Sequence, residues 1–69
     1  MNNKIANTVE CRFYSIKDVM AILNIGRNKA YKLANVNGVP VMRIGNTILF
    51  EKEEFDLWIS KHIGKTVIL

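Results

Sequence analysis

The sequence predicts a small α+β domain with three helices, a β-hairpin and a short N-terminal strand. Three stretches carry apolar residues at intervals of three and four, which is the period of a helix with one buried face. Two short runs rich in β-branched residues flank Gly45-Asn46, a pair typical of a tight hairpin turn. The chain has 69 residues, of which 49% are hydrophobic, and this composition indicates one compact core rather than a disordered tail.

The N-terminal part of the chain predicts a flexible segment followed by a strand. Residues 1–8 are polar and rich in Asn, so we expect them to be flexible. In residues 9–14, Val9, Cys11 and Phe13 alternate with more polar side chains, as in a half-buried strand. No secretion signal precedes the strand and no apolar run is long enough to span a membrane, so we expect a cytoplasmic protein without a membrane partner.

Ser15 predicts the start of the first helix. Asp18 follows it at the spacing of a capping box, and Tyr14 and Val19 have the spacing of a hydrophobic staple. The helix is expected over residues 16–24, and its inward stripe consists of Ile16, Val19, Met20 and Leu23. We expect Gly26 to take the positive φ that ends this helix, with Ile25 in the corner before the next one.

A second helix is expected from Arg27 to near Val36, because the turn formers that follow end in Pro40. Small apolar residues, Ala30, Leu33 and Ala34, form its buried face. Its other side and flanks carry polar or cationic groups that can reach phosphates and base edges, namely Arg27, Asn28, Lys29, Tyr31, Lys32 and Asn35.

A β-hairpin is expected next, with strands at residues 41–44 and 47–50 and Gly45 at the first central position of the turn. Because an isolated hairpin is marginally stable in water, we expect the strand at residues 9–14 to pair with it.

The third helix is expected over residues 52–62, and its apolar stripe consists of Phe55, Trp58, Ile59 and His62. Phe55 and Trp58 are expected to supply much of the core. Four carboxylates near its start are expected to act as capping charge, and these are Glu51, Glu53, Glu54 and Asp56. Gly64 suits the position just past the helix, and the apolar tail at residues 64–69 is expected to pack back on the domain.

The charge distribution favours a polyanionic partner. Ten Lys and Arg against six Asp and Glu give a net charge of +4, and no acidic residue lies between Val19 and Phe50. Double-stranded DNA is therefore the expected partner of the second helix.

No catalytic or metal-binding motif is found. The chain lacks a glycine-rich phosphate loop and a zinc-protease motif, and His62 is the only histidine. Cys11 is the only cysteine, which excludes an internal disulfide and a thiolate zinc site. We expect no enzymatic activity, no cofactor and no small-molecule substrate.

Four motifs in this order resemble the excisionase-type branch of the MerR-like winged helix-turn-helix superfamily. They span residues 14–60 and are Tyr14-Ser15-Ile16-Lys17-Asp18-Val19, the run from Leu23 to Ala34, Pro40-Val41-Met42-Arg43-Ile44-Gly45, and Phe55-Asp56-Leu57-Trp58-Ile59. The resemblance implies a winged helix-turn-helix domain over residues 9–63, with the hairpin as the wing.

Excisionases are small proteins of phages and conjugative transposons that bind the arms of attachment sites and direct a tyrosine recombinase toward excision. The resemblance therefore implies DNA binding and bending, a tyrosine recombinase (integrase) as partner, and cooperative self-association on DNA. It assigns DNA contacts to the second helix and to the wing residues Arg43, Asn46 and Thr47. Two positions depart from the family pattern: the wing tip, Gly45-Asn46-Thr47, lacks the several Arg of many relatives, and Glu51 replaces a frequent proline.

Two other functions are compatible with the sequence. A transcriptional regulator of a mobile element would use the same fold and surface. A protein-binding module would instead use the outward-facing Leu57 and the tail Val67-Ile68-Leu69, with the basic helix merely solvated.

Overall fold

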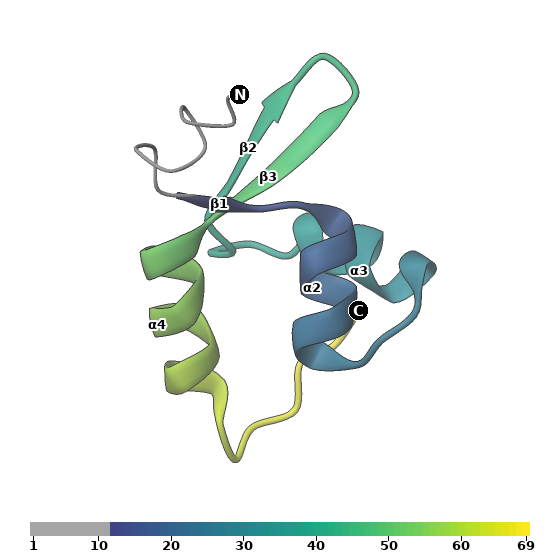
Figure 1. Cartoon of the computed structure of the whole chain (residues 1–69). Coiled ribbons are helices and arrows are strands. Elements are labelled where there is room, and N and C mark those ends of the chain that lie inside the picture. Colours follow the sequence, from purple (N-terminus) through teal and green to yellow (C-terminus); the bar gives the residue numbers. More distant parts are fainter. Residues whose placement is uncertain (1–11) are drawn as a thin grey trace.

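The computed structural model, which describes residues 12–69, has the predicted α+β fold with three helices and a three-stranded antiparallel sheet (Figure 1). In chain order the elements are β1 (Phe13–Tyr14), α2 (Ile16–Leu23), α3 (Arg27–Ala34), β2 (Val41–Ile44), β3 (Thr47–Glu51) and α4 (Lys52–His62). The hairpin of β2 and β3 projects from the body, with α2 and α3 on one side below it and α4 on the other. Residues 1–8 and the predicted strand positions Val9–Cys11 lie outside the described residues.

The first helix begins at the predicted capping box. Ser15 Oγ accepts a hydrogen bond from the backbone N–H of Asp18 at 3.2 Å, and Asp18 Oδ2 accepts one from the backbone N–H of Ser15 at 2.9 Å. These two bonds satisfy backbone donors that no helical carbonyl can reach.

The turn between α2 and α3 differs from the prediction. Asn24, with φ of 55°, takes the left-handed conformation, whereas Gly26 is extended, with φ of −77°, and serves as the N-cap of α3. The backbone N–H of Ile25 donates to the carbonyl of Met20 at 3.0 Å, a bond typical of a Schellman motif, and both side chains pack against the core. Asn24 therefore ends the helix, and the assignment of positive φ to Gly26 was wrong.

The second helix buries its predicted apolar face and ends slightly earlier than expected. Ala30, Leu33 and Ala34 are buried in the core. The helix ends at Ala34 rather than near Val36, because the following backbone N–H groups bond three residues back instead of four.

The hairpin has the predicted turn and strands, except that β3 runs one residue further, to Glu51. Ile44 pairs with Thr47 across Gly45-Asn46, and Gly45 has a φ of 59°. β3 lies in the centre of the sheet and pairs with β1, with Tyr14 opposite Phe50, so the expected support from the N-terminal strand is present at Phe13–Tyr14.

The core is centred on Phe50, Phe55 and Val19, which are fully buried. The rings of Phe50 and Phe55 lie 5.0 Å apart, and Tyr14 meets Phe55 edge-on at 6.0 Å. Trp58 is only half-buried, stacked between Phe55 at 5.9 Å and His62 at 4.2 Å. The prediction thus held for Phe55, but Phe50 contributes more to the core centre than Trp58 does.

The carboxylates of α4 have two different roles. Glu51 is the N-cap, and its Oε1 accepts from the backbone N–H of Glu54 at 2.7 Å, so it does act as capping charge. Asp56 does not: its Oδ1 accepts a hydrogen bond from the Tyr14 hydroxyl at 3.1 Å, which joins α4 to β1.

The end of the chain only partly packs back on the domain. Gly64 has a φ of 86°, as expected just past the helix, and Val67 packs against the core. Ile68 is 80% exposed and Leu69 47% exposed. Within residues 12–69, no helix has the length and apolar character needed to cross a membrane.

Candidate nucleic-acid interface

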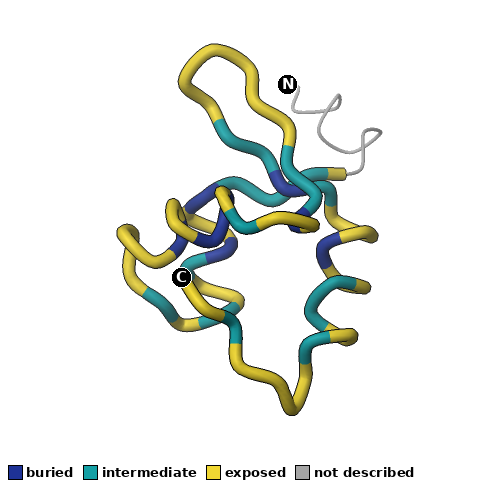
Figure 2. Tube along the Cα trace, turned by 180° about the vertical axis from the view of Figure 1, so that it is seen from behind, coloured by how far each residue is buried: buried dark blue, intermediate teal, exposed yellow. Residues whose placement is uncertain are grey.

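The exposed face of α3 carries the predicted binding residues because its other face is fixed in the core. Every DNA contact predicted for α3 and for its C-cap, Asn35, is exposed, and Tyr31 is 40% exposed. These residues are Arg27, Asn28, Lys29, Tyr31, Lys32 and Asn35. Ala30 and Ala34 are buried, and their small side chains let the helix lie close to the core. Figure 2 shows buried and exposed stretches alternating along the chain. The helix therefore presents its polar side to solvent without any rearrangement.

The cations of α3 are not used within the fold. The side chains of Arg27, Lys29 and Lys32 form no hydrogen bond or ion pair with any other described residue. No acidic residue occurs between Val19 and Phe50 to neutralise them. Their charge is thus available for phosphate oxygens.

The N-terminus of α3 differs from those of the other two helices. Ser15 caps α2 and Glu51 caps α4, and both helices carry acidic residues in the first turn. At α3, Gly26 provides no side-chain cap, and the first turn contains no acid but has Arg27 and Lys29. Cations near the N-terminus lower the stability of a helix, because this end of the helix dipole is positive. The same positive end attracts a phosphate group. The sequence-based site did not include Gly26, although a glycine before a cationic, acid-free turn is visible in the sequence.

Arg43 joins the wing to the end of α3. Its Nη2 donates a hydrogen bond to Asn35 Oδ1 at 2.7 Å and a longer one to the carbonyl of Ala34 at 3.4 Å. A guanidinium at this position also complements the negative end of the α3 dipole. Two predicted DNA contacts, Asn35 and Arg43, are therefore brought together and bonded to each other.

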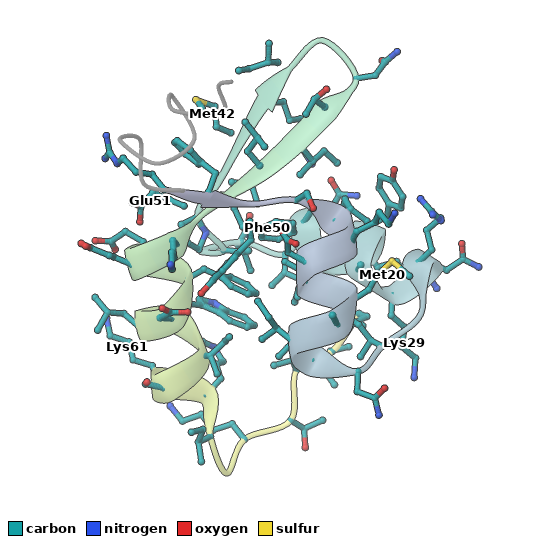
Figure 3. All side chains as sticks on the ribbon, viewed as in Figure 1. Met20, Lys29, Met42, Phe50, Glu51 and Lys61 are labelled. Carbon is teal, nitrogen blue, oxygen red and sulfur yellow. The ribbon has the colours of Figure 1, made fainter. Side chains whose placement is uncertain are left out.

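The wing tip lies apart from this pair. Asn46 and Thr47 are exposed, and their side chains form no hydrogen bond with another residue of the described part. In Figure 1 the end of the hairpin projects away from α3, and in Figure 3 Met42 on β2 and Lys29 on α3 lie at the upper left and the lower right of the view. The predicted residues thus form one surface along α3, with Arg43 at its end, and a second group at the hairpin tip.

A separate apolar pocket of about 310 Å³ lies away from the cationic face. It is lined from α2, α3, α4 and the tail by Leu23, Ile25, Leu33, Trp58, Ile59, His62, Ile63, Val67 and Leu69. Leu57 is 53% exposed, as expected, but does not line this pocket. Among residues 12–69, no three His, Cys, Asp or Glu side chains gather closely enough to hold a metal ion.

Comparison with protein families gives a match for most of the chain. Residues 13–63 match the model of a family described as a helix-turn-helix domain, a span that runs from β1 to just past α4. Searches of curated proteins and of solved structures give no match.

Proposed function

Because the chain belongs to this helix-turn-helix domain family, it is a small DNA-binding protein, and we propose that it is an excisionase, a recombination directionality factor of a mobile genetic element. In this role it binds the arms of attachment sites, bends them and promotes excision by a tyrosine recombinase. It catalyses no reaction itself.

The observation that carries the DNA-binding part of the proposal is the unused cationic surface of α3. Arg27, Lys29 and Lys32 have no partner among the described residues, and no side chain caps the helix. Inserted in a major groove, this end of α3 would direct its backbone N–H groups and cations at phosphates. Asn28 and Tyr31, which are also exposed, can then reach base edges.

The short length of α3 supports the role of an accessory DNA-binding protein. α3 has eight residues. A helix of this length spans about 12 Å, which corresponds to roughly three to four base pairs of DNA. One copy reads too little sequence to define a unique site, so we propose that several copies bind side by side and that a recombinase bound next to them completes the assembly.

The resemblance over residues 14–60 supports the excisionase assignment in particular. The four motifs of this resemblance lie on β1 with α2, on α3, on β2 and on α4, in the order expected for the excisionase-type branch. The position that is often proline in relatives holds Glu51, which here caps α4. Bending of DNA by such a protein costs about 1–6 kcal/mol, and contacts within the excisive assembly offset this cost.

The proposal is tested by footprinting across both ends of the element that carries the gene, with and without its tyrosine recombinase, and by an excision assay. We expect protection of attachment-site arms and excision that depends on the protein. Lys32→Ala should reduce the stimulation, and Lys61→Ala, an equal charge change on α4, should not. A footprint confined to an operator, with excision unaffected, would instead identify a transcriptional regulator.

A further inference from the structure

The apolar pocket between the helices is not explained by DNA binding. In Figure 1, α4 stands on one side of this pocket and α2 with α3 on the other, and the C-terminal segment runs back from α4 toward α2. The helix α3 contributes only Leu33 to the lining, and Leu33 lies on the opposite side of the helix from the exposed Tyr31. The pocket is thus separate from the surface that we assign to DNA.

The pocket is apolar volume that the chain itself does not fill. Protein interiors are normally packed without voids much larger than a water molecule. The C-terminal segment already forms one wall through Val67 and Leu69, so it is not the missing occupant. Apolar surface left open in such a hollow is typical of a ligand site. The half-exposed side chains around it include Leu23, Ile25, Trp58 and Ile59.

The volume and the lining restrict the size and the polarity of the ligand. An apolar cavity of about 150 Å³ accommodates one benzene ring, so a pocket of about 310 Å³ accommodates two fused rings. Among the described residues, no charged side chain lines the pocket, and its aromatic members are Trp58 and His62. Because an ion would lose its hydration without gaining a partner there, a neutral aromatic molecule fits best.

The wall formed by α4 offers one polar contact. Nδ1 of His62 lies 2.8 Å from the carbonyl oxygen of Trp58. Since a carbonyl oxygen can only accept, Nδ1 donates, and in the neutral ring Nε2 remains an acceptor. Neither Nε2 nor the indole N–H of Trp58 bonds to another described residue. The two rings stack with centroids 4.2 Å apart, and a hydroxyl group at their edge can donate to Nε2 or accept from the indole N–H.

We propose that this pocket binds a neutral bicyclic aromatic molecule that carries one hydroxyl group. The two rings lie among Leu33, Trp58 and Ile59, and the hydroxyl donates a hydrogen bond to Nε2 of His62. The ligand is bound and not converted, since no hydroxyl, thiol or carboxylate side chain of the described residues lines the pocket. This binding function goes beyond the one proposed above, because it uses the opposite face of α3.

The test uses the full chain and three probes with the same ring system: 2-naphthol, naphthalene, which lacks the hydroxyl, and 2-naphthoate, which is charged. Trp58 is the only tryptophan, so its indole N–H signal in NMR spectra reports binding without further assignment. We expect 2-naphthol to shift this signal with a Kd of roughly 0.1–1 mM, as for a ligand of this size. Naphthalene should bind about threefold to tenfold more weakly, because one hydrogen bond is missing, and 2-naphthoate should not bind.

Three variants locate the probe and its hydroxyl group. His62→Phe keeps a ring beside Trp58 but has no acceptor, so it should bind 2-naphthol and naphthalene equally. Ile63→Asp puts a charge on the pocket lining at a position that is 75% exposed, and it should weaken 2-naphthol binding about tenfold or more. Leu57→Asp makes the same change at an exposed position outside the pocket and should leave binding unchanged. Unfolding in urea checks that each variant is folded.

An unmoved Trp58 signal with every probe at millimolar concentration would overturn the site. Equal binding by Ile63→Asp and Leu57→Asp would place the probe elsewhere on the protein, and a preference for 2-naphthol that persists in His62→Phe would overturn the hydroxyl contact. A Trp58 signal that moved with protein concentration, together with a dimer in sedimentation, would assign the pocket to a second copy of the chain. None of these results involves a duplex, so failure here leaves the proposed function intact.

Discussion

The guanidinium of Arg43 on β2 donates a 2.7 Å hydrogen bond to Oδ1 of Asn35, the C-cap of α3. This bond connects the two elements that the family resemblance assigns to DNA. Neither residue is fully free for a nucleic-acid ligand, which changes the role expected for both from simple contact to positioning.

The Arg43–Asn35 bond should contribute modestly to stability. In a double-mutant cycle with Arg43→Ala and Asn35→Ala, we expect a coupling free energy of about 0.5–1 kcal/mol, as is typical of an exposed charged pair. Urea unfolding of the four proteins measures it. A coupling below about 0.3 kcal/mol would show that the bond does not hold the wing in solution.

Lys32 and Asn28 should affect DNA binding in different ways. Lys32→Ala should weaken binding to all sequences and reduce the salt slope by about 0.9, since one phosphate contact is lost. Asn28→Ala should relax sequence preference, because an amide can pair bidentately with adenine. Titration of a selected and a scrambled duplex distinguishes the two, and Lys61→Ala serves as the charge control on α4. Equal losses without any change in preference would show that these roles are misassigned.

Gly26 allows stability and binding to be separated. A Cβ at this position would meet no atom within 4 Å, and the φ of −77° suits any residue. Gly26→Asp should cap α3 and stabilise the fold by about 0.3–1 kcal/mol, yet weaken duplex binding roughly tenfold by repelling phosphate. Gly26→Asn adds a neutral cap of the same shape, so it should stabilise the fold without this loss. Equal binding by the two variants would place the N-terminus of α3 away from the DNA.

Substitutions along α4 should lower the free energy of unfolding by different amounts, according to how deeply each side chain is buried. Phe55→Ala should cost about 3–5 kcal/mol, because the ring is fully buried. Trp58→Ala should cost about 2 kcal/mol, since the indole is half-buried and its loss mainly removes the stacking on Phe55 and His62. Leu57→Ala should stay within about 0.5 kcal/mol. Thermal or urea unfolding gives the order, and an equal cost at positions 57 and 58 would contradict it.

Local signals predicted much of this fold. The capping box at Ser15, the turn at Gly45 and the bounds of α4 depend on contacts within a few residues, and the structure has all three as predicted. The exposed face of α3 was likewise predictable from helical periodicity.

The sequence-based prediction failed where two residues could adopt the same backbone conformation. It also missed contacts between residues that are distant in sequence. Both Asn24 and Gly26 can adopt positive φ, and in the structure Asn24 does so, with Ile25 packed against the core. The bonds from Arg43 to Asn35 and from Tyr14 to Asp56 join separate elements through exposed polar side chains. No periodicity or propensity specifies such pairs, so they could be recognised only in three dimensions.

If the cationic face of α3 lies in a DNA groove, duplex binding must depend steeply on salt. Binding of the wild-type chain is measured between low and physiological salt. With roughly three to five phosphate contacts, the plot of log affinity against log salt should fall with a slope of about −2.7 to −4.5. A flat plot, or no duplex binding at the lowest salt, would show that α3 does not bind in a DNA groove and would favour a protein-binding module.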